Sequence, residues 1–455
     1  MLGTPITVTA RGGRVALVVL VAATAAAVPL GAVSHAAVQL PLLAVALVAF
    51  AIVLGAHRRT PFLTRKAVVV ASGVLMLVAV VTPPTSSKDI WAHVMYGRIV
   101  SVHHASPYVH PPAEYPKDPT FARIAPAWHH SRSVYGPAFT AASAAGTAAA
   151  GESPLAQRLF FQLLYALAVM LALLLLWRRG ADAGALAFVG LNPVIVAVVA
   201  GGHNDLLIGV AVLAAVLAAG DGRAARAGVL LAVAVLVKVV ALLPLVAVVA
   251  WRVVRRGWRP GLRASVAAAV TIVAGYALAG GTTALGPVRA ASEFRSKASL
   301  WSFPVTWIER HVFGRTADVG ALAIAAGVVL AVVAIVVVAA RLGDIDPALA
   351  AGGAALVYLL GAFYVLPWYA AWALPVLALA WRSRLALLAE IQAGLLLLVY
   401  VDRPGVHGIV FHDVVGTVAT HVVPVVEAAV LFTLIVVSVR RLRGTLVADR
   451  ARAVA

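Results

Sequence analysis

Asp89 is the first acidic residue of the chain, and it stands directly after a long apolar run. It belongs to a polar stretch that extends from Pro83 to Pro137. His93 and Tyr96 follow at spacings of four and three residues, which places all three side chains on one face of a helix. A carboxylate in such a cluster can remove the proton of an attacking hydroxyl, so Asp89 is predicted to be a general base. The alternative is that Asp89 caps the helix that follows it.

Lys238 is the second candidate, because it is a cation in the middle of the apolar segment 227–250. A charge in such a segment costs about 2.5–3.5 kcal/mol on membrane-insertion scales, so it needs an anionic partner. We expect Lys238 to bind a phosphate group and to favour its departure; the alternative is that its long side chain reaches the surface. Arg295 and Lys297, in a later polar loop, are further candidates for phosphate binding, with a solvated loop face as the alternative.

Polar and aromatic side chains elsewhere are predicted to bind a sugar. His203, Asn204 and Asp205 follow two glycines in a short turn, and Asn204 or Asp205 can alternatively cap the next helix. Indole and phenol rings can stack on sugar rings; the alternative for isolated ones is the aromatic belt of a membrane protein. The predicted sugar- or acceptor-binding residues are His93, Tyr96, Trp128, Tyr135, His203, Asn204, Asp205, Trp368 and Tyr369.

Histidines are frequent in the polar stretch, at positions His103, His104, His110, His129 and His130. Their spacing matches no usual zinc pattern and few acids accompany them, so we expect no metal site. The chain has no cysteine, which excludes disulfides and a thiol nucleophile.

The composition indicates a membrane protein. Of the 455 residues, 63% are hydrophobic and only 12% are charged, whereas about a quarter are charged in soluble domains. Several apolar runs reach the ~18 residues needed to cross a bilayer and lack the alternation of barrel strands, so the predicted fold is an all-α polytopic bundle. The net charge of +19 comes from short basic clusters between these runs. That is the positive-inside pattern and not a nucleic-acid-binding face.

The basic clusters predict about 12–14 crossings with both termini in the cytoplasm. The expected apolar segments are 14–34, 36–56, 67–82, 155–177, 183–200, 204–220, 227–250, 262–280, 320–340, a hairpin at 347–381, 385–400 and 416–439. Both flanks of 227–250 are basic, so we expect two short helices that meet near Lys238. Residues 135–151 are barely long enough to cross, and we expect a helix on the outer face.

The expected organisation is one transmembrane domain, residues 1–440, followed by a basic cytoplasmic tail, residues 441–455. Two large outer loops, 83–137 and 281–319, gather the candidate residues on the extracytoplasmic side of the plasma membrane. ATP and nucleotide sugars are absent there, so an activated donor has to be lipid-linked. The sequence has no P-loop and no GxGxxG motif after a strand, which agrees with this interpretation.

Several short motifs, in order along the chain, carry a resemblance to a known family. They are Asp89–Gly97 with Tyr96, Ser106-Pro107-Tyr108, Trp128, Tyr135-Gly136-Pro137, Gly202-His203-Asn204-Asp205-Leu206, the helix ending at Lys238 before Pro244, and Pro367-Trp368-Tyr369 with Trp372. The chain resembles the actinobacterial polyprenol-phosphate-mannose-dependent α-mannosyltransferases, membrane enzymes of the GT-C fold. One departure is that Ile90 and Trp91 stand where the family usually has a tyrosine, which leaves the acceptor open.

The resemblance implies transfer of mannose from β-linked polyprenyl phosphate to a glycan or glycolipid hydroxyl, with formation of an α linkage, of the α-1,6 type found in lipomannan. It implies that the acid of the first outer loop, here Asp89, is catalytic, and that no divalent metal or other cofactor is required. Two other classes stay open on the residues alone. A transporter or flippase of a lipid-linked substrate would explain the break at Lys238 but predicts inverted repeats, which the sequence lacks. A transferase using another polyprenyl-phosphate sugar is the second.

Overall fold

The computed structural model of the chain describes residues 9–32, 36–84, 87–287, 295–311, 319–400 and 414–454. The α-helices are α1 (Ala10–Ala32), α2 (Ala36–Arg59), α3 (Arg65–Val81), α4 (Asp89–Ser101), α5 (Pro137–Ala150), α6 (Pro154–Arg178), α7 (Ala183–Gly190), α8 (Pro193–Gly201), α9 (Asp205–Gly220), α10 (Ala224–Val237), α11 (Leu242–Arg256), α12 (Trp258–Leu278), α14 (Ser302–His311), α15 (Val319–Ala339), α16 (Ala348–Gly361), α17 (Leu374–Leu377), α18 (Arg384–Tyr400) and α20 (Val423–Val454). The short segments are the 3₁₀ turns η1 (Pro112–Glu114), η2 (Phe121–Arg123), η3 (Pro126–Trp128), η4 (Val239–Ala241), η5 (Gly281–Leu285), η7 (Pro367–Trp372) and η8 (Ala378–Ala380), and the π turn η9 (Val418–Val422).

The prediction of an all-α polytopic membrane protein is confirmed. Within the described ranges there is no strand, and six helical stretches are long and apolar enough to cross a membrane: Ala10–Leu30, Val38–Arg59, Pro154–Arg178, Ala183–Gly201, Trp258–Leu278 and Val414–Gly444. Four shorter apolar helices, α9, α10, α15 and α16, accompany them. Large apolar side chains face outward, since Val18, Leu77, Leu167 and Val273 are 63–69% exposed. Such a surface suits lipid and not water.

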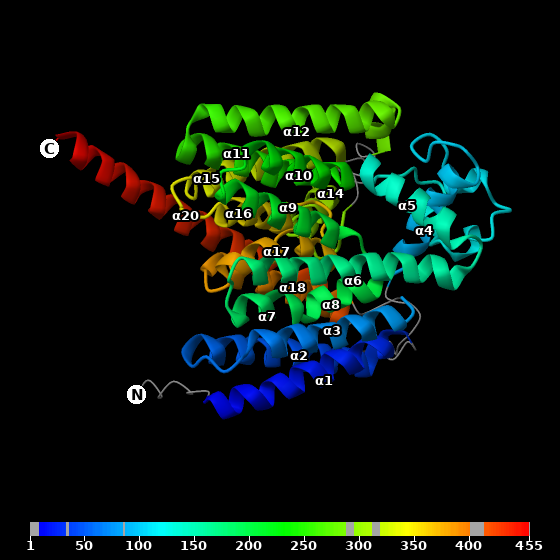
Figure 1. Cartoon of the computed structure of the whole chain (residues 1–455), viewed down its shortest axis with the longest axis horizontal. Helices are drawn as coiled ribbons and strands as arrows, with labels where there is room; N and C mark the ends of the chain where they lie inside the picture. Colours follow the sequence, from blue (N-terminus) through cyan, green and yellow to red (C-terminus); the bar gives the residue numbers. More distant parts are fainter. Residues whose placement is uncertain are drawn as a thin grey trace.

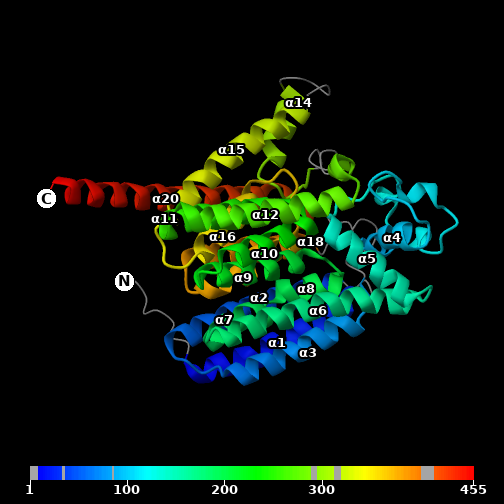
Figure 2. The same ribbon diagram turned by 45° about the horizontal axis from the view of Figure 1, so that its top comes forward.

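The helices form a bundle with a polar cap at one end. The start of α1 and the end of α20 lie at one end of the bundle, whereas α4, α5 and the loop between them project from the other (Figures 1 and 2). α14 and α15 extend away from the bundle in the turned view (Figure 2). α5 has 14 residues, about 21 Å at 1.5 Å per residue, which is too short to cross about 30 Å of hydrocarbon. It packs beside α4 in the cap.

Two departures from straight helices shape the site. The predicted break at Lys238 is confirmed, because α10 ends at Val237, Lys238 is extended and α11 begins at Leu242 after the turn η4. The second half of the predicted hairpin 347–381 is not a long helix. Leu366 is extended before Pro367, as proline requires of its predecessor, and the chain continues as η7 and the four-residue α17. Trp368, Tyr369 and Trp372 therefore lie in a 3₁₀ turn and do not form one face of an α-helix.

Not every part of the predicted loops and tail is described. Residues 288–294 and 312–318 of the outer loop 281–319 lie outside the described residues. α20 continues through the predicted tail 441–455 as far as Val454. The number of crossings, the domain boundary at residue 440 and the side of the membrane on which each loop lies stay predictions.

Candidate active site

A cavity of about 1000 Å³ lies where the polar cap meets the bundle. Residues from α4, the loop after it, the α8–α9 turn, the break at Lys238 and η7 line it together. Eleven of the predicted site residues are among its lining: Asp89, His93, Tyr96, Trp128, Tyr135, His203, Asn204, Asp205, Lys238, Trp368 and Tyr369. Arg295 and Lys297 are not among them; both lie exposed on the chain before α14.

Asp89 is the first helical residue of α4, and its carboxylate points to a distant part of the chain. Lys88 holds the capping position, and the Asp89 backbone N–H donates to Ser87 Oγ at 3.1 Å. Asp89 Oδ2 lies 3.3 Å from His203 Nδ1, and the Asp89 side chain is 18% exposed to the cavity. The carboxylate thus contacts His203, and the capping residue Lys88 makes no side-chain hydrogen bond to the first turn of α4. The alternative interpretation of Asp89 as a helix cap is therefore wrong.

The surroundings keep Asp89 ionised. Burial by itself raises the pKa of this carboxyl, but the hydrogen bonds from His203 and Ser87, together with the electrostatic interactions with His203 and His93, outweigh burial and lower the pKa to about 2. Asp89 is therefore a carboxylate at every physiological pH, ready to accept a proton but weakly basic in the free enzyme.

His93 lies one helical turn after Asp89 and is neutral. Burial lowers its pKa to about 3, because the Asp89 carboxylate only partly offsets the lost solvation. Its Nδ1 lies 2.9 Å from the hydroxyl of Tyr165 on α6, and its ring makes edge contacts with Tyr135 and Phe139, both at 4.9 Å between centroids. These contacts fix the imidazole in one orientation and hold α4 against α6.

His203 is held between Asp89 and an aromatic ring. Its imidazole stacks on the Trp368 indole with centroids 3.7 Å apart and planes 12° apart, so one face of that indole is occupied by protein. Tyr400 meets Trp368 edge-on at 4.8 Å. Trp368 therefore orients His203. A sugar ring could stack only on the part of the Trp368 indole that His203 and Tyr400 leave uncovered.

Lys238 and Asp205 form a buried ion pair. Lys238 Nζ lies 3.1 Å from Asp205 Oδ1, with side-chain exposures of 16% and 2%. The Trp372 indole N–H donates to the same oxygen at 2.7 Å, and Lys238 Nζ lies 4.4 Å from the centre of the Tyr369 ring. Lys238 does not reach the outer surface, and Asp205 does not cap α9, so both alternative interpretations are wrong. The Asn204 side chain makes no capping bond either.

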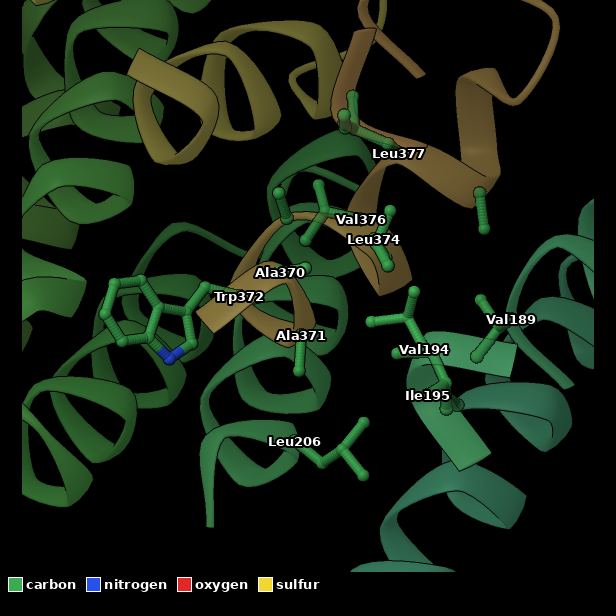
Figure 3. Close-up of a cluster of buried hydrophobic side chains, with 14 of the residues drawn as sticks. Val189, Val194, Ile195, Leu206, Ala370, Ala371, Trp372, Leu374, Val376 and Leu377 are labelled. Atoms are coloured by element: carbon green, nitrogen blue, oxygen red, sulfur yellow. The ribbon is translucent and has the colours of Figure 1, made fainter. Parts of the chain in front are cut away.

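The residues of the turn η7 are buried in the bundle, and its aromatic side chains line the cavity. Tyr369 and Trp372 are three residues apart and stack at 4.3 Å, because side chains at this spacing eclipse in a 3₁₀ turn. Figure 3 shows Trp372 with Ala370 and Ala371 beside Leu206 of α9, with Val194 and Ile195 of α8 nearby. The packing explains why η7 presents rings to both His203 and Lys238.

The loop between α4 and α5 is held in place by contacts at two points. The Gly136 N–H donates to Val237 O at 2.9 Å, directly before Lys238, and a Cβ at position 136 would lie 2.2 Å from Leu236 O. Only glycine allows this close approach. At the far side, buried Asp118 binds Arg98 and His103 at 2.9 and 2.8 Å.

Sequence reasoning missed several residues of the site. Trp372 and Tyr165 make direct hydrogen bonds to Asp205 and His93, and Tyr358, Tyr364 and Tyr400 line the cavity. The sequence pattern includes Trp372 with Pro367-Trp368-Tyr369, but does not predict Asp205 as its partner. Tyr165, Tyr358 and Tyr400 belong to apolar helices and Tyr364 follows one, so the sequence around them gave no signal. In the part of the chain that the structure describes, no group of three or more His, Cys, Asp or Glu side chains is arranged to hold a metal.

The comparison with known families decides what kind of site this is. Residues 5–255 match the family described as "Alpha-(1->6)-mannopyranosyltransferase, N-terminal domain". The chain belongs to this family. The comparison with curated proteins gave no match. As a member of the alpha-(1->6)-mannopyranosyltransferase family, the chain is a membrane-embedded mannosyltransferase that acts on a glycan acceptor, which decides against the transporter. The match includes Asp89, His203 and Lys238, whereas η7 follows it in the chain.

Proposed function

We propose that the protein transfers mannose from polyprenyl-phosphate mannose to a glycan or glycolipid hydroxyl at the extracytoplasmic face of the plasma membrane, with formation of an α-1,6 linkage. The observation that carries the proposal is the convergence of an ionised carboxylate, Asp89, and a buried cation, Lys238, on one cavity at the polar end of the bundle. The family supports mannose and the linkage. The polar cap, whose residues line the cavity, lies at the end of the bundle opposite the start of α1 and the end of α20 (Figure 1). The basic clusters predict that both of these ends are cytoplasmic, which supports the extracytoplasmic side for the cavity.

In the proposed step, the acceptor hydroxyl attacks the anomeric carbon of the donor. The new C–O bond forms as the hydroxyl proton passes to the Asp89 carboxylate, and the bond from the anomeric carbon to the phosphate oxygen breaks with its electron pair on phosphate. Attack from the face opposite to phosphate turns a β-linked donor into an α-linked product. A low pKa in the free enzyme is compatible with this role, because the proton has to move only late in the displacement.

Lys238 is suited to the leaving phosphate. An ammonium group carries three donors, and Asp205 occupies one of them. The remaining donors can meet the phosphate oxygens, whose negative charge rises as the bond breaks. We propose that this cation supplies the charge stabilisation without a divalent metal. In this role Asp205 fixes the position of Lys238 instead of touching the sugar.

The wall of the cavity supports a lipid-linked donor. Its lining includes polar and aromatic residues of the loop after α4, among them Trp128 and Tyr135. It also includes the apolar residues Val239, Val240, Pro287, Ala326, Leu330 and Phe363. A polyprenyl chain gains about 0.8 kcal/mol for each buried CH₂ group on such a surface, whereas a nucleotide finds few polar partners there.

The test is Asp89→Asn, which keeps the shape and removes the proton acceptor. We expect transfer from polyprenyl-phosphate mannose in membranes to fall by about 10²–10⁴-fold, the usual contribution of a general base. Asp118→Asn is the matched control, because Asp118 is a buried acid of the same loop that binds Arg98 away from the cavity. Wild-type turnover by a folded Asp89→Asn protein would refute the proposed role.

A further inference from the structure

α6 carries a row of three buried polar side chains in an otherwise apolar helix. Arg158, Gln162 and Tyr165 are spaced by four and three residues, which puts them on one face, and their exposures are 8%, 0% and 0%. Polar groups inside a membrane helix are stable only when other helices satisfy them. Their hydrogen-bond partners therefore show which neighbouring elements α6 holds in position.

Gln162 joins the ends of two helices. Its Nε2 donates to Ala79 O at 2.9 Å and Thr82 O at 3.0 Å, at the last turn of α3, and lies 3.4 Å from Ala200 O in the last turn of α8. The last carbonyl groups of a helix have no partner within the helix, so one amide satisfies both ends. Arg158 holds the amide, since its guanidinium donates to Gln162 Oε1 at 2.8 Å.

These two helix ends lead directly into the site. Thr82 is seven residues before Asp89, and Ala200 is three residues before His203. Asp89 and His203 meet at 3.3 Å, although 114 positions separate them in the chain. Gln162 is the side chain that bridges the backbones from which the two residues extend. A shift of this amide changes the separation of both partners, even though Gln162 does not line the cavity.

We infer that Gln162, held by Arg158, is a positioning residue that sets the contact between Asp89 and His203. The inference rests on the proposed function of Asp89. Tyr165 extends the same row, because its hydroxyl binds His93 Nδ1 at 2.9 Å one turn after Asp89. One face of α6 thus fixes three elements of the site, namely the end of α3, the end of α8 and the middle of α4.

The contact matters because His203 opposes the effect of burial on the Asp89 carboxyl. The groups that interact electrostatically with Asp89 are His203, His93, Ser87, Tyr96, Tyr135, Tyr165 and Tyr364. Of these, His203 contributes the largest lowering of the Asp89 pKa. If the contact lengthens, burial raises the pKa, and a base that must be ionised is then lost at a higher pH.

The experiment compares Gln162→Leu with Gln157→Leu in purified full-length protein. Both glutamines are buried on α6, but Gln157 donates to Gly151 O at the α5–α6 turn. We expect Gln162→Leu to lower kcat by about 10- to 100-fold with KM changed by less than about twofold, as for a small misplacement of a catalytic group. The acid limb of its kcat/KM–pH profile should rise above pH 4, where wild type and Gln157→Leu should keep none.

A double-mutant cycle with His203→Ala separates positioning from general loss of stability. If Gln162 acts through His203, the two effects are not additive, and the double variant loses little more than His203→Ala alone. Additive losses or an unmoved acid limb in folded Gln162→Leu protein would overturn the inference. Gln162→Asn, which keeps the amide but shortens its reach, replaces Gln162→Leu if the latter does not fold. Wild-type turnover by Asp89→Asn would instead refute the proposed role of Asp89, independently of the result for Gln162→Leu.

Discussion

Variants of the Lys238–Asp205 pair can distinguish a role of Lys238 in stability from a role in the reaction, because each charge can be removed alone or together with its partner. Replacement of Lys238 by methionine leaves the Asp205 carboxylate 2% exposed and without its cation. Removal of one member of a buried pair costs about 3–5 kcal/mol, whereas removal of both charges is often neutral. We therefore expect Lys238→Met to lower the Tm markedly, and Lys238→Met combined with Asp205→Asn to restore most of it. In the double variant the amide oxygen at position 205 can still accept the hydrogen bond from the Trp372 indole.

Activity should behave differently from stability in the same set of variants. A hydrogen bond to a charged group contributes about 1.5–3 kcal/mol, which corresponds to about 10- to 150-fold in rate at 1.36 kcal/mol for each factor of ten. Both Lys238→Met and the stable double variant should lose about this much in kcat/KM for the donor. The KM for the donor should rise more than the KM for the acceptor, because Lys238 is proposed to contact only the donor phosphate.

The measurements are thermal unfolding in detergent and transfer of radiolabelled mannose with donor and acceptor varied separately. A double variant as unstable as the single one would show that the ion pair is not what holds Lys238. Recovery of full donor kcat/KM in the double variant would refute a phosphate-binding role and leave Lys238 purely structural. Equal changes in the KM for the donor and the KM for the acceptor in the double variant would contradict a specific contact with the donor.

Two further predictions concern pH and metal ions. The Asp89 pKa of about 2 in the free enzyme predicts that kcat/KM keeps no acid limb above about pH 4. In His203→Ala the opposing effect of burial on this pKa prevails, so kcat/KM should fall at a higher pH, and a kcat/KM–pH profile that matches wild type would contradict the assigned contact. Lys238 is proposed to stabilise the negative charge of the leaving phosphate in place of a metal ion. Mannose transfer in membranes washed with EDTA should therefore remain within about twofold of untreated membranes. Full loss of transfer that is restored by Mg²⁺ or Mn²⁺ would refute that assignment.

Local sequence patterns predicted the helical segments and eleven of the residues that line the site. Apolar length and basic clusters gave the helical segments, and basic residues at both ends of 227–250 predicted the break at Lys238. A proline before two aromatic residues, Pro367-Trp368-Tyr369, was not sufficient to predict η7, because a 3₁₀ turn depends on the packing of α8 and α9 around it. Arg295 and Lys297 were chosen for charge alone, and charge does not determine distance to a cavity.

The sequence by itself determined that the chain is a helical membrane protein with a long polar stretch that contains Asp89, since hydrophobicity and charge are local properties. Tertiary structure decided the partner of each polar group. Asp89 has the same capping pattern whether it binds its own helix or His203, and Asp205 and Lys238 are 33 positions apart. A buried charge binds whatever the packed helices bring within about 3 Å, and that choice is made by the fold as a whole.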